Sequence, residues 1–225
     1  MKIISEKIIH RLILYKKLLI NLQSESVKNI FSHKLAILAS RTPAQVRRDL
    51  MVVGYDGSTV SGYNVSELLS SIVQFLYAPH PQKVALIGLG NLGRAILDYC
   101  YDRHPNISIA ASFDNDPSKV NRVIRNCRCY HIDKLEKIIK KLEIDVAIIA
   151  IPTEHAQSIA NRLVKSGITG LINYTPTRLY LPTDIYIENR DMMMAVEKAA
   201  FFARNLHKGH LKKSAGSLNK LEERN

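Results

Sequence analysis

The stretch that decides the fold of this chain is Lys83-Val-Ala-Leu-Ile-Gly-Leu-Gly-Asn-Leu-Gly93. Its apolar run 84–87 is typical of a strand buried on both faces of a parallel sheet, and a helical pattern of apolar residues begins near residue 91. Glycines occupy the connection between the two. We therefore predict strand, tight turn and helix in succession, as in the dinucleotide-binding unit of doubly wound α/β domains.

Each glycine of this turn has its own physical role. Gly88 permits the tight turn, Gly90 lets backbone N–H groups approach a pyrophosphate, and Gly93 lets the helix pack closely on its strand. The phosphates would lie at the positive end of the helix dipole. The candidate residues for this contact are Gly88, Gly90, Asn91, Leu92 and Gly93. A glycine-rich turn in an unrelated α/β domain is the alternative.

A carboxylate follows the second predicted strand, 107–113. Asp114 would accept hydrogen bonds from a ribose hydroxyl and repel a 2′-phosphate, so the sequence favours NAD(H) over NADP(H) as the cofactor. Asp114 could instead cap the helix predicted from Pro117, although Asp116 is better placed for that role.

The net charge bounds the partners of the protein. The 225 residues carry a formal charge of +12, which calls for a polyanionic partner, either nucleic acid or an anionic membrane surface. The apolar run 3–22 is interrupted by charged residues and histidine, so we expect an amphipathic helix and neither a membrane span nor a signal peptide.

The cysteines indicate the compartment. Cys100, Cys127 and Cys129 form no even disulfide framework, which suits a reducing compartment, by default the cytoplasm. The run Cys127-Arg-Cys129-Tyr-His131 has no second pair of ligands at finger-like spacing, so no metal site is expected.

The first third of the chain has the spacing of a helix-turn-helix. Helices are predicted over 5–21 and 24–30, and Ser32 is predicted to cap a short helix 33–39. A turn, Ser40-Arg41-Thr42, then leads into a helix from Pro43 to about residue 52. The glycines and alternating residues of 54–63 predict a small two-stranded wing.

The second helix of this pair has residues suited to reading DNA. Val46 and Leu50 share one face, while Gln45, Arg47 and Arg48 point elsewhere and suit a major groove. Arginine forks bind guanine or phosphate, and glutamine reads adenine. The alternative is an ordinary solvated helix face. The candidate DNA-binding residues of the helix-turn-helix and wing are Arg41, Pro43, Gln45, Arg47, Arg48, Ser58 and Thr59.

The proline-bearing segment 77–81 follows a helix predicted over 65–76 and makes a natural boundary between domains 1–78 and 79–205. Strands and helices alternate beyond it, so a parallel doubly wound (Rossmann) sheet of α/β class is expected. The predicted elements are strands 83–88, 107–113, 144–150 and 169–173 and helices 91–102, 117–125, 133–142 and 153–166.

The helix predicted over 191–205 is apolar on most of its circumference. It needs more burial than a small sheet supplies, so we interpret it as an oligomer element, with an ordinary core helix as the alternative. The tail 206–225 is basic and polar and is predicted to be disordered.

Together these features resemble the Rex family of redox-sensing transcriptional repressors over residues 1 to about 205. The resemblance is carried by Thr42-Pro-Ala-Gln-Val-Arg-Arg-Asp-Leu50, Gly62-Tyr-Asn-Val65, Gly88-Leu-Gly-Asn-Leu-Gly-Arg94, Phe113-Asp114 and Asn173-Tyr-Thr-Pro-Thr-Arg178. It implies an N-terminal winged helix, a Rossmann domain that binds NAD(H), and a homodimer with an exchanged C-terminal helix. Double-stranded operator DNA would be bound in the free or NAD⁺-bound state and released on NADH binding.

The resemblance also implies roles for residues outside the glycine turn. Ile151 and Pro152, with Thr175 and Pro176, would border the nicotinamide half of the cofactor. A polar sensing network between domains and subunits would include Arg11, Tyr99 and Asp191. A surface cation, a packed aromatic residue and an N-cap are the alternative roles of these three residues.

Two positions depart from the family pattern. Ser58 and Thr59 stand where family wings usually carry a basic pair, and the helix-turn-helix turn reads Ala39-Ser40-Arg41 where a glycine is usual. Loss of two phosphate contacts would flatten the salt dependence of DNA binding by roughly two units of log–log slope.

The expected function is therefore an NADH/NAD⁺-responsive repressor and not an enzyme. A small NAD-dependent oxidoreductase is the first alternative, with His155 as its candidate acid or base, but about 120 residues of Rossmann domain leave no separate substrate domain. His155 is interpreted in the first place as a surface histidine at the start of a helix. A nucleotide-binding interaction protein without strong DNA binding is the second.

Overall fold

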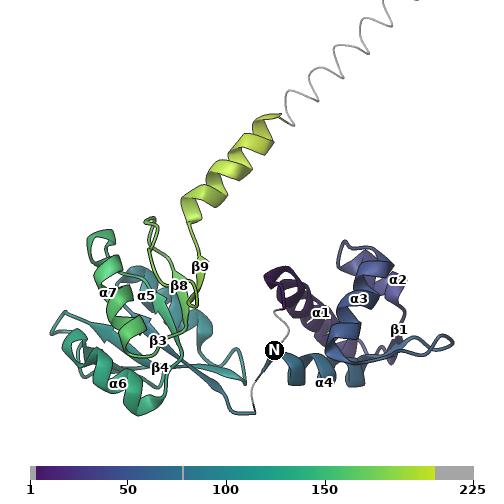
Figure 1. The fold of residues 1–225 in the computed structure, drawn as a ribbon, viewed down its shortest axis with the longest axis horizontal. Coiled ribbons are helices and arrows are strands. Elements are labelled where there is room, and N and C mark those ends of the chain that lie inside the picture. Colours follow the sequence, from purple (N-terminus) through teal and green to yellow (C-terminus); the bar gives the residue numbers. More distant parts are fainter. Residues whose placement is uncertain (1–3, 78, 206–225) are drawn as a thin grey trace, which may run out of the picture. The chain divides into compact units, whose positions relative to one another are not determined.

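The computed structural model describes residues 4–77 and 79–205. These residues form two compact units, of which the first ends at Gln82 and the second begins at Lys83 (Figure 1). This division follows the proline-bearing segment 77–81 almost directly and lies at the start of the first strand of the large sheet. Each unit has its own hydrophobic core.

The first unit is a small helical domain with a two-stranded sheet. Its main core combines α1, α2, α3 and α4, with Leu12, Leu35, Leu50 and Leu68 among its fully buried side chains. Its elements are α1 (Glu6–Ser24), β1 (Asn29–Ile30), α2 (Ser32–Leu38), α3 (Pro43–Val53), β2 (Tyr63–Asn64) and α4 (Val65–Leu76).

The predicted helix from Pro43 is confirmed as α3, and local chemistry explains both of its ends. The hydroxyl of Thr42 accepts a hydrogen bond from the backbone N–H of Gln45 at 3.2 Å, and Pro43 occupies the first turn, where no N–H is needed. Gly54 ends the helix with φ of 77°. The helix predicted over 65–76 is confirmed as α4.

Two predictions in this unit are wrong, and a third is met only in part. Residues 24–30 do not form a helix, because α1 ends at Ser24 and the chain turns so that Asn29 and Ile30 pair with β2. Ser32 is the first residue of α2 and Phe31 is its N-cap. The predicted wing is smaller than expected: within residues 54–63 a single antiparallel bridge joins Ser58 to Gly62, and the strand that follows, β2, pairs with β1.

Within residues 79–205, the second unit contains a seven-stranded sheet in the order β5-β6-β4-β3-β7-β8-β9. The pairs β4–β6, β3–β7, β7–β8 and β8–β9 are parallel, as predicted, and β5 is antiparallel to β6. Its strands are β3 (Gln82–Ile87), β4 (Ile107–Asp114), β5 (Val123–Ile124), β6 (Cys127–His131), β7 (Val146–Ile149), β8 (Gly170–Asn173) and β9 (Tyr186–Asn189). Its helical segments up to residue 165 are α5 (Asn91–Cys100), η1 (Ile132–Lys134), α6 (Leu135–Leu142) and α7 (Thr153–Lys165).

Side chains of β3 alternate between two cores, as the doubly wound fold requires. Ala85 and Ile87 pack in the core that contains residues of α6 and α7. Val84 and Leu86 pack in a second core with residues of α5. The sheet is therefore covered on both faces, which explains why β3 reads as a continuous apolar run.

The predicted helix over 117–125 is wrong. The chain instead forms turns and then the hairpin of β5 and β6, which sequence reasoning missed. Its two-residue loop, Arg125-Asn126, has φ of 49° and 59°, the left-handed pair of a type I′ turn. The sequence signal was weak because the usual glycine is absent from this loop.

The end of the described chain contains one element that was not predicted, the edge strand β9. The predicted terminal helix is present over 192–205. The prediction of a disordered tail, 206–225, lies outside the described residues. None of the helices within 4–77 and 79–205 has both the length and the apolar character needed to cross a membrane.

Candidate functional site

The glycine turn after β3 lies where β3 has β4 on one side and β7 on the other. Gly88 has φ of 95°, and a Cβ on it would stand 2.3 Å from the carbonyl oxygen of Ala150. A Cβ on Gly93 would stand 1.9 Å from the carbonyl oxygen of Gly88. Both positions thus exclude any other residue type for reasons internal to the fold.

Gly90 differs from its two neighbours. A Cβ added to Gly90 would meet no protein atom within 4 Å. Gly90 is the N-cap of α5 and offers no side chain to the first amides of the helix. The amino end of α5 therefore combines open space, backbone N–H donors and the positive end of a helix dipole, the conditions that suit a phosphate group.

Asp114 ends β4 beside this turn and is 8% exposed. Its Oδ2 accepts hydrogen bonds from the backbone N–H of Leu89 at 2.7 Å and from Lys119 Nζ at 3.2 Å, and its Oδ1 accepts one from the N–H of Asp116 at 2.9 Å. Because a carboxylate has about four lone-pair positions, one acceptor position remains for a hydroxyl group.

The charge of Asp114 follows from these partners. Burial acts to raise the pKa of the carboxyl group, but the N–H groups of Asp116 and Leu89 and the ammonium group of Lys119 lower it below its ordinary value. Asp114 is therefore ionised at neutral pH. An ionised carboxylate accepts hydrogen bonds from ribose hydroxyls, as the sequence predicts.

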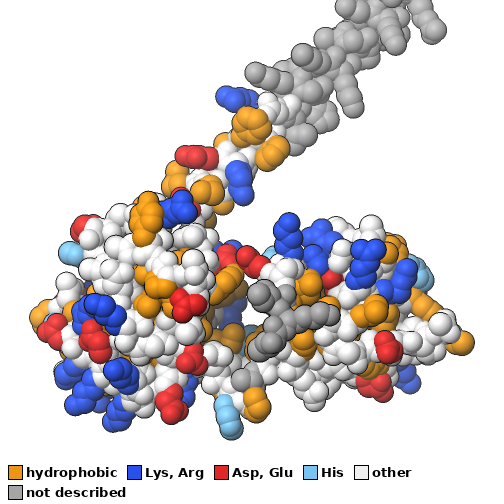
Figure 2. Space-filling view, viewed as in Figure 1, with side chains coloured by type: hydrophobic (Ala, Val, Ile, Leu, Met, Phe, Trp, Pro, Cys, Tyr) orange, Lys and Arg blue, Asp and Glu red, His pale blue; other side chains and the backbone are white. Residues whose placement is uncertain are grey.

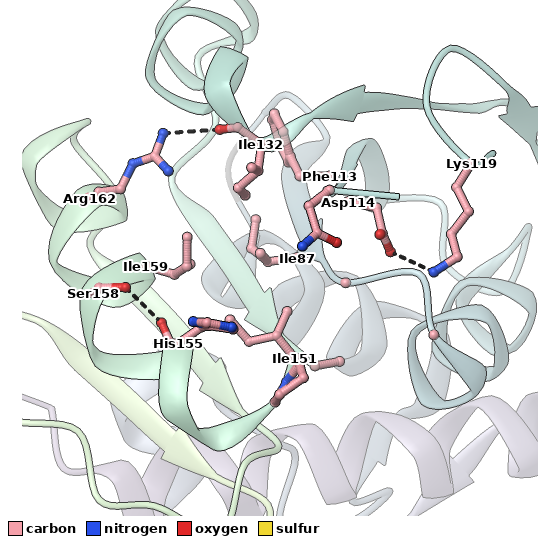
Figure 3. Close-up of a pocket in the computed structure, with 15 residues that line it drawn as sticks. Ile87, Phe113, Asp114, Lys119, Ile132, Ile151, His155, Ser158, Ile159 and Arg162 are labelled. Atoms are coloured by element: carbon pink, nitrogen blue, oxygen red, sulfur yellow. Dashed lines mark hydrogen bonds and ion pairs between the residues drawn. The ribbon is translucent and has the colours of Figure 1, made fainter. Parts of the chain in front are cut away.

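A cavity of about 470 Å³ opens between the glycine turn, Asp114 and the start of α7 (Figure 3). Ile87, Phe113, Ile132 and Ile159 give it an apolar interior. Lys119 and Asp114 lie on one side of it and Arg162 on the other. Its lining is Ile87, Gly88, Gly90, Phe113, Asp114, Asn115, Lys119, Ile132, Ala150, Ile151, Pro152, His155, Ser158, Ile159 and Arg162.

Arg162 is fixed at the far side of the cavity. Its Nε and Nη2 donate to the two carboxylate oxygens of Glu136 at 2.6 and 3.0 Å, and Nη2 also donates to the carbonyl of Ile132 at 3.0 Å. The pair joins α7 to α6 and holds the wall of the cavity. The arrangement provides an apolar slot of a size typical for small-molecule sites, with polar groups at its edges.

The structure places only some of the predicted cofactor residues on this cavity. Gly88, Gly90, Asp114, Ile151 and Pro152 line it. Asn91, Leu92 and Gly93 form the first turn of α5 and do not line it. Thr175 and Pro176 follow β8 and also lie outside its lining; the hydroxyl of Thr175 donates to Asn173 Oδ1 at 2.7 Å.

Sequence reasoning missed much of the apolar slot. Ile132 follows β6, and this strand was not predicted. Ser158, Ile159 and Arg162 lie on α7, which was predicted, but its orientation toward the cavity cannot be read without the sheet order. His155 was interpreted mainly as a surface histidine at a helix start, and the structure shows it exposed and in the lining of the cavity. The signal available in the sequence was the rule that ligands bind at the carboxyl ends of the strands.

The predicted DNA-reading residues lie on and around α3. Val46 and Leu50 are buried in the core of the first unit, as predicted, and Arg48 is exposed. Arg47 is exposed and donates from Nη1 to the hydroxyl of Ser32 at 3.1 Å. Figure 2 shows Lys and Arg side chains gathered over α2 and α3. The residues Arg41, Pro43 and Thr59 are exposed as well.

The tip of the wing is built by Ser58. Its hydroxyl accepts hydrogen bonds from the backbone N–H groups of Val60 and Ser61 at 3.1 and 3.2 Å, and its backbone is bridged to Gly62. Val60 at the tip is 87% exposed. Ser58 thus has a local structural task that a basic residue in its place does not perform.

The three residues predicted as a sensing network have local partners. Arg11 pairs with Asp49, with an Nε–Oδ2 distance of 2.6 Å. The Tyr99 ring is 65% exposed and lies 4.3 Å from the guanidinium carbon of Arg103. Asp191 Oδ1 accepts from the N–H groups of Met193 and Met194 as an N-cap. Within the described part of the second unit, no hydrogen bond joins Tyr99 to Asp191.

Family comparisons match both units. A family described as "Putative DNA-binding protein N-terminus" matches residues 3–50, and one described as "CoA binding domain" matches residues 79–177. The chain is 35% identical over 201 residues to the redox-sensing transcriptional repressor Rex of Carboxydothermus hydrogenoformans. The matched region covers 89% of this chain and 97% of the relative.

Solved structures give the same result. The structure of RSP in complex with β-NADH matches with a TM-score of 0.81 and 30% identity, over 95% of this chain and 99% of that chain. RSP in complex with β-NAD⁺ and operator DNA matches with a TM-score of 0.84 and 31% identity, over 96% of this chain and 99% of that chain.

Proposed function

Because this chain belongs to the Rex family of redox-sensing transcriptional repressors, we propose that it binds operator DNA and releases it when NADH binds. The observation that carries the proposal is the open, uncapped amino end of α5 beside the ionised Asp114. The two features fit the pyrophosphate and the ribose of one dinucleotide. The relatives and the solved RSP complexes support the same reading.

NAD(H) is the ligand that these residues fit. Gly88 and Gly90 would hold the pyrophosphate, Asp114 the adenosine ribose, and the apolar slot between Ile132 and Ile159 the adenine ring. Ile151 and Pro152 would continue toward the nicotinamide. Thr175 and Pro176 remain candidates for that half. The nucleotide undergoes no reaction on the protein. The protein distinguishes NADH from NAD⁺ by how tightly it binds each of them.

Release of DNA follows from a shift between two forms of the dimer. The equilibrium moves by the amount by which the protein binds NADH more tightly in its DNA-releasing form. A tenfold preference per site corresponds to about 1.4 kcal/mol. The proposed network of Arg11, Tyr99 and Asp191 would couple the two units. Arg11 would then have to leave Asp49, its partner in the structure, in order to join this network.

The homodimer is proposed from the helix over 192–205. Its large apolar side chains are more than half exposed in one chain, with Met192 at 72% and Phe202 at 62%. Burial of this face against a second copy would remove a large apolar surface from water. The cytoplasm is the proposed compartment, since operator DNA and NADH are both found there.

We propose that the protein is not an enzyme. Arg162 and Lys119 at the cavity are both engaged with carboxylates. His155 is the candidate acid or base of the oxidoreductase alternative. Turnover of NADH with a small carbonyl compound would favour that alternative, and tight NADH binding without turnover would favour a sensor.

The function is tested by selecting duplexes from a random DNA pool with the full chain. The affinity for the selected duplex is then measured with NADH and with NAD⁺ at two salt concentrations. We expect a specific duplex, at least tenfold weaker binding with NADH, and no such loss with NAD⁺. Failure to select any duplex would contradict DNA binding, and equal affinities with both nucleotides would contradict redox sensing.

A further inference from the structure

A buried carboxylate lies behind the proposed DNA-reading face of α3. Asp49 is 1% exposed, and it accepts four hydrogen bonds. Arg11 donates from Nε to Oδ2 at 2.6 Å and from Nη2 to Oδ1 at 2.7 Å. Tyr15 donates its hydroxyl to Oδ2 at 2.9 Å, and Gln45 donates from Nε2 to Oδ1 at 2.8 Å. These bonds fill the lone-pair positions of the carboxylate.

The charge state of Asp49 decides how its partners are oriented. Burial acts to raise the pKa of this carboxyl group, but the hydrogen bonds from Arg11, Tyr15 and Gln45 lower it below its ordinary value. Asp49 is ionised at neutral pH and can only accept hydrogen bonds. Every group that contacts it must therefore present a donor.

This requirement fixes the amide of Gln45. The nitrogen and oxygen of a glutamine amide have nearly the same shape, so a free side chain turns either way. A flipped Gln45 would place its oxygen against the carboxylate of Asp49, which has no proton to share. Nε2 therefore faces Asp49 and gives it one of its two hydrogens, while Oε1 is the acceptor that the amide presents to another partner.

Gln45 also lies on the part of α3 where DNA reading is proposed. It is one helical turn before Asp49 and is partly exposed, and the exposed Arg48 lies between the two in sequence. Residues near the amino end of a recognition helix contact base edges in the major groove. The buried Asp49 thus determines how the amide of Gln45 is oriented at the surface of the unit.

We infer that Asp49 is a positioning residue that makes Oε1 the base-reading atom of Gln45. Gln45 then selects a base that offers an exocyclic amino group in the major groove, N6 of adenine or N4 of cytosine. The inference rests on the proposed function, because it requires that α3 bind in a major groove.

The test uses the full chain and the duplex that it selects from a random pool. Each adenine of a half-site is replaced singly by purine, which lacks the 6-amino group, and each cytosine by pyrimidin-2-one, which lacks the 4-amino group. At one position we expect about five- to tenfold weaker binding by the wild type, the effect of one lost hydrogen bond. The Gln45→Ala variant should lose less than twofold at that same position.

If that base is adenine, a second analogue distinguishes a contact made by Oε1 of Gln45 from a contact made by Nε2. In 7-deazaadenine the N7 acceptor is missing and the amino group is kept. We expect wild-type affinity to stay within twofold. A loss as large as that caused by purine would mean that the donor of Gln45 also reads the base, and would overturn the assignment to Oε1.

The role of Asp49 is tested with Asp49→Asn. An asparagine offers both a donor and an acceptor to Gln45, so the amide can turn, and the cost of removing the amino group should fall below twofold. A purely structural role would weaken binding to all duplexes equally. Tyr15→Phe is the matched control, since it removes one bond to Asp49 and leaves Gln45 in place; its analogue discrimination should equal that of the wild type.

The outcomes separate this inference from the proposed function. If the chain selects no duplex, the proposed function itself fails. If it selects a duplex but no analogue distinguishes the wild type from Gln45→Ala, the inference alone is overturned. If Asp49→Asn does not fold, the comparison of the wild type, Gln45→Ala and the analogues still decides which atom reads the base.

Discussion

The helices α3 and α5 begin in opposite ways. The amino end of α3 is closed by the hydroxyl of Thr42 and by Pro43, so its exposed side chains are what it presents to a partner. The amino end of α5 begins at Gly90 without a side-chain cap and presents backbone N–H groups. Partner binding by the first unit therefore depends on the side chains of α3, whereas partner binding by the second unit depends on the absence of a side chain at the start of α5.

The interiors of the two units also differ, since one is held by side-chain hydrogen bonds and the other by close backbone contacts. The first unit contains the saturated carboxylate of Asp49, which ties α1 to α3. The second unit holds its site by close backbone contact, with Gly88 against Ala150 and Gly93 against Gly88. Removal of one buried group should damage the first unit most, and addition of one carbon atom should damage the second.

The largest effect is expected for Asp49→Ala. It leaves Arg11, whose side chain is 14% exposed, without its carboxylate partner, and it leaves the Tyr15 hydroxyl unsatisfied. Loss of one partner of a buried pair costs about 3–5 kcal/mol. Chemical unfolding of the first unit measures this loss. The exposed pair of Arg125 and Asp98 in the second unit gives the control, since Asp98→Ala should cost that unit less than about 1 kcal/mol.

Acid titration tests the contribution of Asp49 to stability in a second way. The folded pKa of Asp49 lies below its ordinary value of 3.8, so its contribution to stability is present above that value and is lost as the pH falls through the folded pKa. The first unit of the wild type should lose stability below about pH 4, while Asp49→Asn should lose less over the same range. Equal slopes for the two proteins would exclude this role of Asp49.

The next effect is expected for Gly93→Ala. Its Cβ would stand 1.9 Å from the Gly88 carbonyl oxygen, so α5 must move away from its strand. We expect the second unit to lose about 3 kcal/mol. Gly90→Ala is the matched control, because its Cβ meets no protein atom, and thermal unfolding should be nearly unchanged. Similar losses for both variants would contradict the division of roles among the glycines.

A binding effect is expected for Gly90→Val. The Cβ at this position meets no protein atom within 4 Å, so the valine side chain would extend into the space over the amino end of α5. NADH affinity should fall about 100-fold, or about 2.7 kcal/mol, while operator binding persists without a response to NADH. Titration of NADH fluorescence measures the loss. An unchanged titration would exclude this site for the pyrophosphate.

The smallest effect is expected for Ser40→Gly. Ser40 adopts φ of 53° at the turn between α2 and α3, a conformation that favours glycine. The substitution should stabilise the first unit by about 0.5–1 kcal/mol, less than the full strain because glycine also gains freedom in the unfolded chain. Unfolding in urea measures the change, and a destabilised variant would show that Ser40 has a separate role.

The sequence predicted the second unit well where backbone geometry dictates residue type. Gly88 and Gly93 are required by contacts inside the fold, so their spacing identified both the turn and the sheet. The edge of that sheet was missed, because the left-handed pair Arg125-Asn126 forms its turn without glycine. The apolar slot was missed with it, since Ile132 follows the strand that this turn begins.

In the first unit the sequence predicted the helices and not their internal partners. Val46 and Leu50 marked the buried face of α3 by their spacing. The bonds that join Asp49 to Arg11 link residues 38 positions apart, and no local pattern indicates them. Arg11 was instead predicted in a network with Tyr99 and Asp191, from the resemblance alone.

The central claim is that nucleotide binding in one unit changes how two copies of the other unit meet DNA. Spin labels at Arg48→Cys on both subunits, in a variant without Cys100, report the distance between the two α3 helices. With NAD⁺ we expect a distance that matches successive major grooves, about 34 Å between half-sites. With NADH we expect a shift of at least about 5 Å from it, roughly one turn of a helix. The same distance distribution with both nucleotides would contradict the account.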